Sequence, residues 1–188
     1  MKPKILVTRE VFDETLAYLS QHCEVEANQR DVAFSPDALA QRLSGKDGVV
    51  CCLTDRIDAG LLTACPQLKV VANVAVGYDN IDVQAATRRK IIVTNTPGVL
   101  DDTTADFTWC LLVASARRLV EADRYMRAGK YTGWGIMLLC GEDIFAKTIG
   151  ICGLGRIGRG VARRARGFEM RILYTDAVRA PAEVEREL

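Results

Sequence analysis

The sequence predicts an α/β protein built on parallel sheets, and three observations lead to this fold class. Short apolar runs alternate with segments of helical periodicity through the first half of the chain. The run at residues 48–53 is continuously apolar, as expected for a parallel strand that is covered on both faces. Near residue 150 a glycine-rich stretch stands between another apolar run and another helical segment.

The first half contains the elements of one compact doubly wound domain. We expect five strands, at residues 5–8, 24–27, 48–53, 68–74 and 91–94. Helices are expected at 12–21, from Pro36 to Gly45 with Ser35 as N-cap, and at 58–65. This order of elements predicts a flavodoxin-like doubly wound fold.

A second domain is expected to begin at residue 98. Pro97 and Gly98 interrupt the alternation, so we place the boundary between residues 1–97 and 98–188. Asp101 and Asp102 are expected to cap one long helix with apolar residues at three-and-four spacing down to Gly129. A strand at 148–152, a helix from 156 to about 166 and a strand at 171–174 then predict the first part of a Rossmann domain.

Composition narrows the function classes. The chain has 25 Lys and Arg against 24 Asp and Glu, a net charge of +1, which disfavours nucleic acid as a partner. No apolar run reaches the length of a membrane span and no signal sequence is visible, so we expect a cytoplasmic protein without a membrane partner. The seven cysteines lack paired spacing and are expected to be reduced and buried; with one histidine in the chain, no metal site is expected.

The spacing Gly153, Gly155, Gly158 predicts a dinucleotide site. The first glycine permits a tight turn, the second lets backbone N–H groups approach a diphosphate, and the third lets the helix pack against the strand. Asp176, at the end of the next strand, is expected to bind the ribose hydroxyls and to favour NAD over NADP. Arg179 lies close enough in sequence to offer a countercharge, which leaves NADP open.

Four other features have two readings each. The arginine-rich run 156–171 is interpreted as a solvated helix face beside an anionic cofactor rather than a nucleic-acid surface. The loop 73–82 is either a plain strand-to-helix turn or a carboxylate-binding loop. His22 is interpreted as a surface residue rather than a catalytic base, and Trp134 as either a core residue or an exposed residue at a site or interface.

Five stretches together resemble the D-isomer-specific 2-hydroxyacid dehydrogenase family, and within it the glyoxylate/hydroxypyruvate reductase branch, which includes 2-ketogluconate reductases. They read "VANVAVGYDNID", "VTNTPGVL", "TADFTWCLLVASARR", "AGKYTGW" and "KTIGICGLGRIGRGVARRARGFEMRILYTD". The resemblance implies a substrate-binding domain at 1–97 and a cofactor-binding domain at 98–188, around an active-site cleft. It implies substrate contacts from the backbone of Val76 and Gly77 and from Leu53, and cofactor contacts from Thr104, Arg156, Ile157 and Asp176. It implies that Trp134 is a substrate-binding residue that reaches the site of the partner subunit. It also implies a homodimer formed through the helix 102–129.

The sequence departs from this family in one respect. In the family, the catalytic arginine and the Glu–His pair come well after the second Rossmann strand. These positions would fall beyond residue 188, so no catalytic residue is expected within this chain. We therefore expect an inactive amino-terminal fragment that binds cofactor weakly, at its adenosine diphosphate end. Two alternatives stay open: a non-catalytic nucleotide-binding module that dimerises with itself or an intact paralogue, and a reading frame interrupted by a frameshift.

Overall fold

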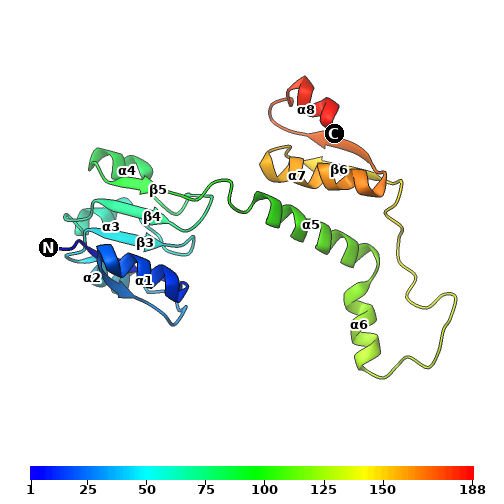
Figure 1. Ribbon diagram of the computed structural model, residues 1–188, viewed down its shortest axis with the longest axis horizontal. Helices are drawn as coiled ribbons and strands as arrows, with labels where there is room; N and C mark the ends of the chain where they lie inside the picture. Colours follow the sequence, from blue (N-terminus) through cyan, green and yellow to red (C-terminus); the bar gives the residue numbers. More distant parts are fainter. The chain divides into compact units, whose positions relative to one another are not determined.

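The computed structural model describes residues 1–188, which divide into two compact units, Met1–Pro97 and Gly98–Leu188 (Figure 1). No helix in the chain combines the length and the apolar character needed to cross a membrane.

The first unit is built on one five-stranded parallel sheet. Its strands are β1 (Lys4–Val7), β2 (Glu24–Ala27), β3 (Gly48–Cys51), β4 (Val70–Asn73) and β5 (Ile92–Thr94). Their order is β2-β1-β3-β4-β5 and every neighbouring pair is parallel. Since this is the flavodoxin-like order, the predicted fold class is confirmed.

The core of the first unit lies on one face of this sheet. The helices are α1 (Asp13–His22), α2 (Pro36–Leu43), α3 (Ala59–Ala64) and α4 (Val83–Arg88), the last of which the sequence analysis did not name. Buried side chains of α2, α3 and α4 pack against β1, β3 and β4, whereas α1 buries none. In Figure 1, α1 lies in front of the sheet and α2 and α3 lie behind it. A right-handed crossover from β1 to the outer strand β2 places α1 on that opposite face.

Side-chain caps explain where three of these helices begin. The hydroxyl of Ser35 accepts a hydrogen bond from the amide of Ala38 at 3.3 Å, so its predicted role as N-cap is confirmed. Asp58 and Asp82 cap α3 and α4 in the same way. Each cap fixes the point at which a strand-end loop turns into a helix, so these loops have defined lengths.

The second unit contains a two-stranded parallel sheet. Its elements are α5 (Asp101–Ala116), α6 (Leu119–Arg127), β6 (Thr148–Cys152), α7 (Arg156–Ala165), the 3-10 turn η1 (Arg166–Phe168), β7 (Arg171–Thr175) and α8 (Ala182–Glu187). Trp109 on α5 is buried against α7, where its indole N–H donates to the carbonyl of Val161 at 3.0 Å. The ring of Trp109 also stacks on Phe168 with 4.7 Å between centroids. This aromatic pair holds α5 and α7 together beside the sheet.

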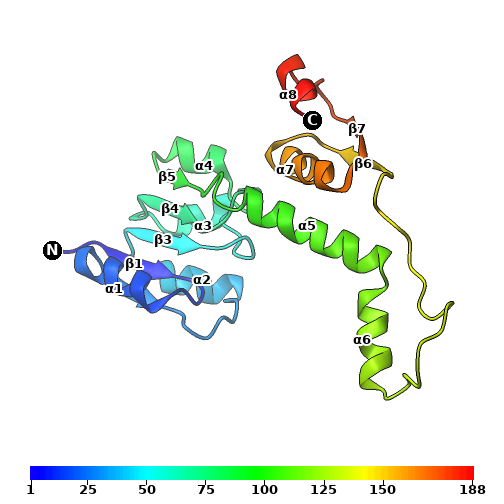
Figure 2. The same ribbon diagram turned by 45° about the vertical axis from the view of Figure 1, so that its right-hand side comes forward.

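The prediction of a single helix from Asp102 to Gly129 is wrong. The chain turns after Ala116 because Arg118 adopts a left-handed conformation with φ of 52° (Figure 2). A distant loop stabilises the break: the amide of Glu142 donates to the carbonyl of Ala116 at 2.8 Å, and the guanidinium of Arg118 donates to the carbonyl of Cys140 at 3.1 Å. At the other end Leu100 is the N-cap, and the two aspartates lie in the first turn.

The prediction that the cysteines are buried is correct for only some of them. Cys51 and Cys65 are buried and Cys23 and Cys52 are half-buried, but three others are exposed: Cys110, Cys140 and Cys152. Residues alternate between the two faces of β6, so Ile149 and Ile151 pack in the core while Cys152 lies on the opposite face. All seven thiols are free.

Candidate functional site

The turn between β6 and α7 requires glycine at two of its three positions. Gly153 has φ of 93°, a conformation that side chains disfavour, and its amide donates to the carbonyl of Thr175 at 2.7 Å. A Cβ atom on Gly158 would overlap the carbonyl oxygen of Gly153. Gly155, by contrast, has an ordinary conformation and open space where its Cβ would lie. Nothing within the protein therefore requires glycine at 155, and the open space lies beside the start of the helix.

Three amides at the start of α7 point to an anion site. Gly155 is the N-cap of this helix and supplies no side-chain acceptor. The first amide bonded within the helix is that of Arg159, which donates to the carbonyl of Gly155 at 2.9 Å. The amides of Arg156, Ile157 and Gly158 precede it and have no acceptor in the protein. Such amides, together with the positive end of the helix dipole, bind phosphate groups.

Asp176 places a fixed carboxylate beside this turn. One of its oxygens accepts the amide of Leu154 at 2.6 Å and the other accepts the amide of Ala177 at 2.7 Å. These two backbone hydrogen bonds lower the pKa of Asp176 below its ordinary value. The carboxylate is exposed and ionised at neutral pH, so it can accept further hydrogen bonds from hydroxyl groups of a ligand.

Arg179 does not serve as the countercharge that the sequence left open for NADP. Its guanidinium makes two hydrogen bonds, each 2.9 Å long, to the carboxylate of Glu185 on α8. The cation that acts on Asp176 is instead Arg159. Arg179 is therefore turned toward α8, while Arg159 lies near Asp176 and donates its Nε to the carbonyl of Leu154.

The arginines of α7 are paired within the second unit. Arg156 contacts Asp101 at 3.0 Å, and Arg164 contacts Asp106 at 2.6 Å. The Nε of Arg159 donates to the carbonyl of Leu154 in the glycine turn. The ion pairs with the acidic residues of α5 therefore involve arginines along the length of α7.

Three predicted residues remain, Ile157 and Thr104 for the cofactor and Trp134 for a site or interface. Ile157 packs partly into the core, and Thr104 is half-buried on α5 just before Ala105. A Cβ on Gly160 of α7 would lie 3.0 Å from the Cβ of Ala105, so the two helices approach closely there. Trp134 is 82% exposed between α6 and β6, so of its two readings the core position is wrong.

In the first unit, the loops after β3 and β4 bring the predicted substrate residues together. A Cβ on Gly77 would lie 4.0 Å from the Cδ2 of Leu53. The carbonyl of Val76 accepts the side-chain amide of Asn95 at 2.7 Å, while the amides of Val76 and Gly77 have no acceptor in the protein. Two adjacent free amides at the carboxyl end of a parallel sheet are available to donate to a small anion.

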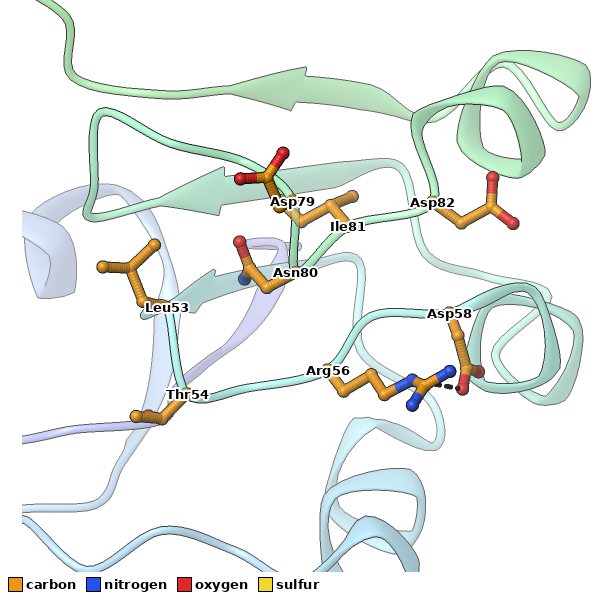
Figure 3. Close-up of a pocket in the computed structure, with 8 residues that line it drawn as sticks. All are labelled: Leu53, Thr54, Arg56, Asp58, Asp79, Asn80, Ile81 and Asp82. Atoms are coloured by element: carbon orange, nitrogen blue, oxygen red, sulfur yellow. Dashed lines mark ion pairs between the residues drawn. The ribbon is translucent and has the colours of Figure 1, made fainter. Parts of the chain in front are cut away.

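A buried amide pair that the sequence analysis missed ties these two loops to each other. Asn73 is 2% exposed, and its side-chain amide donates to the carbonyl of Gly77 at 2.8 Å. The side-chain amide of Asn80 donates across to the loop after β3, to the carbonyls of Cys52 at 3.1 Å and Asp55 at 3.0 Å. Figure 3 shows Asn80 between the two loops. Asn73 therefore holds the backbone at Gly77, and Asn80 ties the same loop to the loop after β3, through partly buried hydrogen bonds.

Asp55 is held in turn by β1. Its carboxylate accepts the hydroxyl of Thr8 at 2.5 Å and the amide of Cys52 at 2.9 Å, and both Thr8 and Asp55 are buried. One feature of the sequence could have identified these buried hydrogen bonds. A polar residue stands directly at the end of an apolar strand, as at Thr8 and Asn73.

A cavity of about 420 Å³ lies beside Leu53 but does not include Val76 or Gly77. It is lined by Leu53, Thr54, Arg56, Asp58, Asp79, Asn80, Ile81 and Asp82 (Figure 3). Arg56, the one cation among these residues, is paired with Asp58 at 3.3 Å. Since the other charged residues are carboxylates, this cavity is unsuited to an anion, and the free amides of the Val76–Gly77 loop remain the better anion site.

His22 lies on α1, the helix that buries no side chain in the core. It is exposed at the end of α1, where its ring meets the edge of Tyr18 at 5.3 Å. No carboxylate contacts it. The histidine therefore has none of the partners that orient a catalytic base.

A flavodoxin-like unit followed by a strand, a glycine turn and a helix with free amides defines a nucleotide-binding α/β protein. Comparison with known proteins identifies the class more narrowly. The profile of the D-isomer specific 2-hydroxyacid dehydrogenase catalytic domain matches residues 5–183, and the chain belongs to this family.

The relatives agree with this assignment. The chain is 50% identical to the glyoxylate reductase of Korarchaeum cryptofilum and 47% identical to that of Thermococcus onnurineus, with all of this chain aligned in both cases. It spans 57% of the length of each of these curated relatives. A solved structure from Polaromonas sp. JS6 66, described as a D-isomer specific 2-hydroxyacid dehydrogenase, NAD-binding, superposes with a TM-score of 0.93 at 36% identity. That match covers 99% of this chain and 59% of the other.

Proposed function

We propose that this chain contributes to an NAD(P)H-dependent reductase that converts glyoxylate, hydroxypyruvate or a related 2-oxoacid to the 2-hydroxyacid. The observation that carries the proposal is the turn at Gly153–Gly158, with three free amides at one end of α7 and the carboxylate of Asp176 beside it. In this proposal Met1–Pro97 binds the substrate and Gly98–Leu188 binds the cofactor. Membership of the family, in which glyoxylate reductases are among the relatives, supports the choice of substrate.

The residues present fit the adenosine diphosphate half of a dinucleotide. The free amides of Arg156, Ile157 and Gly158 would hold the diphosphate, and Asp176 would accept the ribose hydroxyls. Open space at Gly155 allows the diphosphate to approach the backbone. Thr104 is placed in the same site by the family resemblance. When bound, the reduced cofactor supplies a hydride.

On the substrate side, the chain's own backbone does the binding. The free amides of Val76 and Gly77 would donate to the carboxylate of the 2-oxoacid, and the exposed Leu53 would contact its apolar edge. Because Asn73 and Asn80 fix this loop, the amides are held in place before the substrate arrives. Such pre-organisation lowers the entropic cost of binding a small anion.

We propose that the 188-residue chain alone does not turn over. Reduction of a carbonyl requires a proton donor at the developing alkoxide. The one histidine, His22, is exposed on α1 and has no carboxylate partner. The chain would therefore leave the protonation step unsupported.

Homodimerisation through the region 102–129 is proposed for the same protein. Large apolar side chains are exposed on α5, on α6 and in the segment that follows them: Phe107, Leu111, Leu119, Val120, Met126, Trp134, Ile136 and Met137. Exposed apolar surface of this extent marks an interaction site. In the alternative proposal, the same surface binds an intact paralogue and the chain is a non-catalytic nucleotide-binding module.

One set of measurements tests these proposals. Titration of the purified chain with NAD⁺ in a calorimeter should show binding that a Gly155→Asp substitution abolishes, because the new carboxylate would occupy the diphosphate position. Oxidation of NADH with glyoxylate or hydroxypyruvate should stay at background. A substrate-dependent rate that Gly155→Asp removes would contradict the proposed inactivity, and absence of NAD⁺ binding would contradict the cofactor site.

Sedimentation of the chain, alone and mixed with a full-length relative, separates the two interaction proposals. A homodimer that forms alone supports self-association. A complex that forms only with the full-length subunit supports the non-catalytic module. A chain that stays monomeric in both samples contradicts both.

A further inference from the structure

The salt bridge between Arg179 and Glu185 lies directly after the strand that carries Asp176. Arg179 is in the loop between β7 and α8, and both of its hydrogen bonds to Glu185 are 2.9 Å long. Two parallel N–H···O bonds make the strong, directional form of an arginine–carboxylate pair. The guanidinium is thereby turned toward α8.

Glu185 is the fixed partner of this pair. Its carboxylate also accepts the hydroxyl of Tyr174 at 2.5 Å, and the oxygen of that hydroxyl accepts the amide of Ala180 at 3.1 Å. Tyr174 packs with Val184 against the core of the second unit. The side chain of Glu185 is 26% exposed, whereas that of Arg179 is 82% exposed. The arginine is the mobile partner, and the anchored glutamate determines where it points.

The position of Arg179 bears on the ribose end of the cofactor site. Arg179 follows Asp176 by three residues, so the two Cα atoms lie within about 10 Å at the extension limit of the chain. A 2′-phosphate on the adenosine ribose would add a dianion next to the carboxylate of Asp176 and would need a cation there. Arginine is suited to this role because its planar fork matches phosphate oxygens.

We propose that Glu185 is a specificity-determining residue, which excludes 2′-phosphorylated dinucleotides by withholding Arg179 from the ribose edge of the site. The inference rests on the proposed cofactor site. It adds a second selection to the repulsion by Asp176: the carboxylate disfavours the 2′-phosphate, and the salt bridge withholds Arg179, a cation that would add to Arg159 in offsetting that repulsion. Release of Arg179 then opens the site to NADP.

The test compares NAD⁺ and NADP⁺ binding to the 188-residue chain by calorimetry. Glu185→Gln removes the charge that holds Arg179 but keeps a side chain that can still bond to Tyr174. We expect this variant to bind NADP⁺ about threefold to tenfold more tightly relative to NAD⁺, as for one partly exposed arginine–phosphate contact. NAD⁺ affinity itself should not change.

Two further variants identify the cause. Glu183→Gln removes the same charge from an exposed position on α8 that makes no contact with Arg179, and it should leave the ratio of affinities unchanged. Arg179→Gln should have no effect on the ratio in the native chain but should abolish the gain in the Glu185→Gln background. Circular dichroism of each variant checks that the unit remains folded.

The outcomes separate this inference from the proposal on which it rests. Binding of NAD⁺ without a shift in Glu185→Gln overturns the inference alone, as does an equal shift in Glu183→Gln. A native chain that binds neither dinucleotide overturns the cofactor site and the inference with it. A shift that disappears with Arg179→Gln supports both.

Discussion

The paired substitutions Gly158→Ala and Gly155→Ala should separate folding from binding in the glycine turn. A methyl group at 158 would overlap the carbonyl oxygen of Gly153, which belongs to the backbone and cannot move aside by a rotamer change. A methyl group at 155 would meet nothing within 4 Å. The same chemical change therefore has different expected effects at the two positions.

For Gly158→Ala, the start of α7 has to move away from β6. Forcing an extra methyl into a packed site costs about 1–3 kcal/mol, and contact with backbone puts this case near the upper end. The better helix propensity of alanine offsets about 1 kcal/mol. The net expectation is a loss of about 2 kcal/mol of unfolding free energy, which lowers the melting temperature of a small domain by about 10 °C.

Tryptophan fluorescence is the assay, because both tryptophans, Trp109 and Trp134, lie in the second unit. Gly155→Ala should melt within about 0.5 kcal/mol of the native chain, yet bind NAD⁺ about tenfold more weakly, since the methyl would stand between the backbone and the diphosphate. Equal melting temperatures for the native chain and Gly158→Ala would refute the close approach. A large loss of stability in Gly155→Ala would refute the open space.

Three other predictions concern the buried hydrogen bonds and Asp176. Asp55→Ala should lower the unfolding free energy of the first unit by about 2–3 kcal/mol, since the amide of Cys52 loses its acceptor and the buried hydroxyl of Thr8 loses its shorter hydrogen bond; urea unfolding followed by circular dichroism measures it, and a loss below about 0.5 kcal/mol would contradict the role. Trp109→Phe should cost about 1–2 kcal/mol because the buried indole hydrogen bond to the carbonyl of Val161 is lost, whereas Trp134→Phe should be neutral. The carboxyl of Asp176 has a lowered pKa, so its contribution to stability is present above the unfolded pKa of about 4 and is lost as the pH falls through the lowered value. A carboxyl-carbon NMR titration should therefore give a midpoint below that of an ordinary aspartate; a midpoint at or above the ordinary value would show that the backbone hydrogen bonds are absent.

The elements that the sequence predicted well are those specified by short-range chemistry. The N-cap at Ser35 and the strand Thr148–Cys152 lie where they were expected, because each depends on a few adjacent residues. The strand after residue 48 is shorter than expected and ends at Cys51, where Asp55 takes up the next amide. That hydrogen bond also requires β1, which supplies Thr8 from a distant part of the chain.

The break after Ala116 shows the limit of periodicity. The apolar spacing continues across Arg118, so the local pattern predicts one helix. The structure ends that helix because the backbone around Gly141 packs against the carbonyl of Ala116, a contact between residues far apart in sequence. Local propensity cannot register such a contact, and the tertiary contact overrides it.

The sequence by itself determined the α/β class, the glycine turn and the acid that follows it, because backbone conformation, helix capping and hydrophobic periodicity act over a few residues. Only the tertiary structure decided which polar groups meet. It linked Asn80 to the carbonyls of the loop after β3 and turned Arg179 toward Glu185 rather than toward Asp176. The physical reason is that a hydrogen bond or an ion pair forms between side chains only when the fold brings their atoms within about 3 Å of each other.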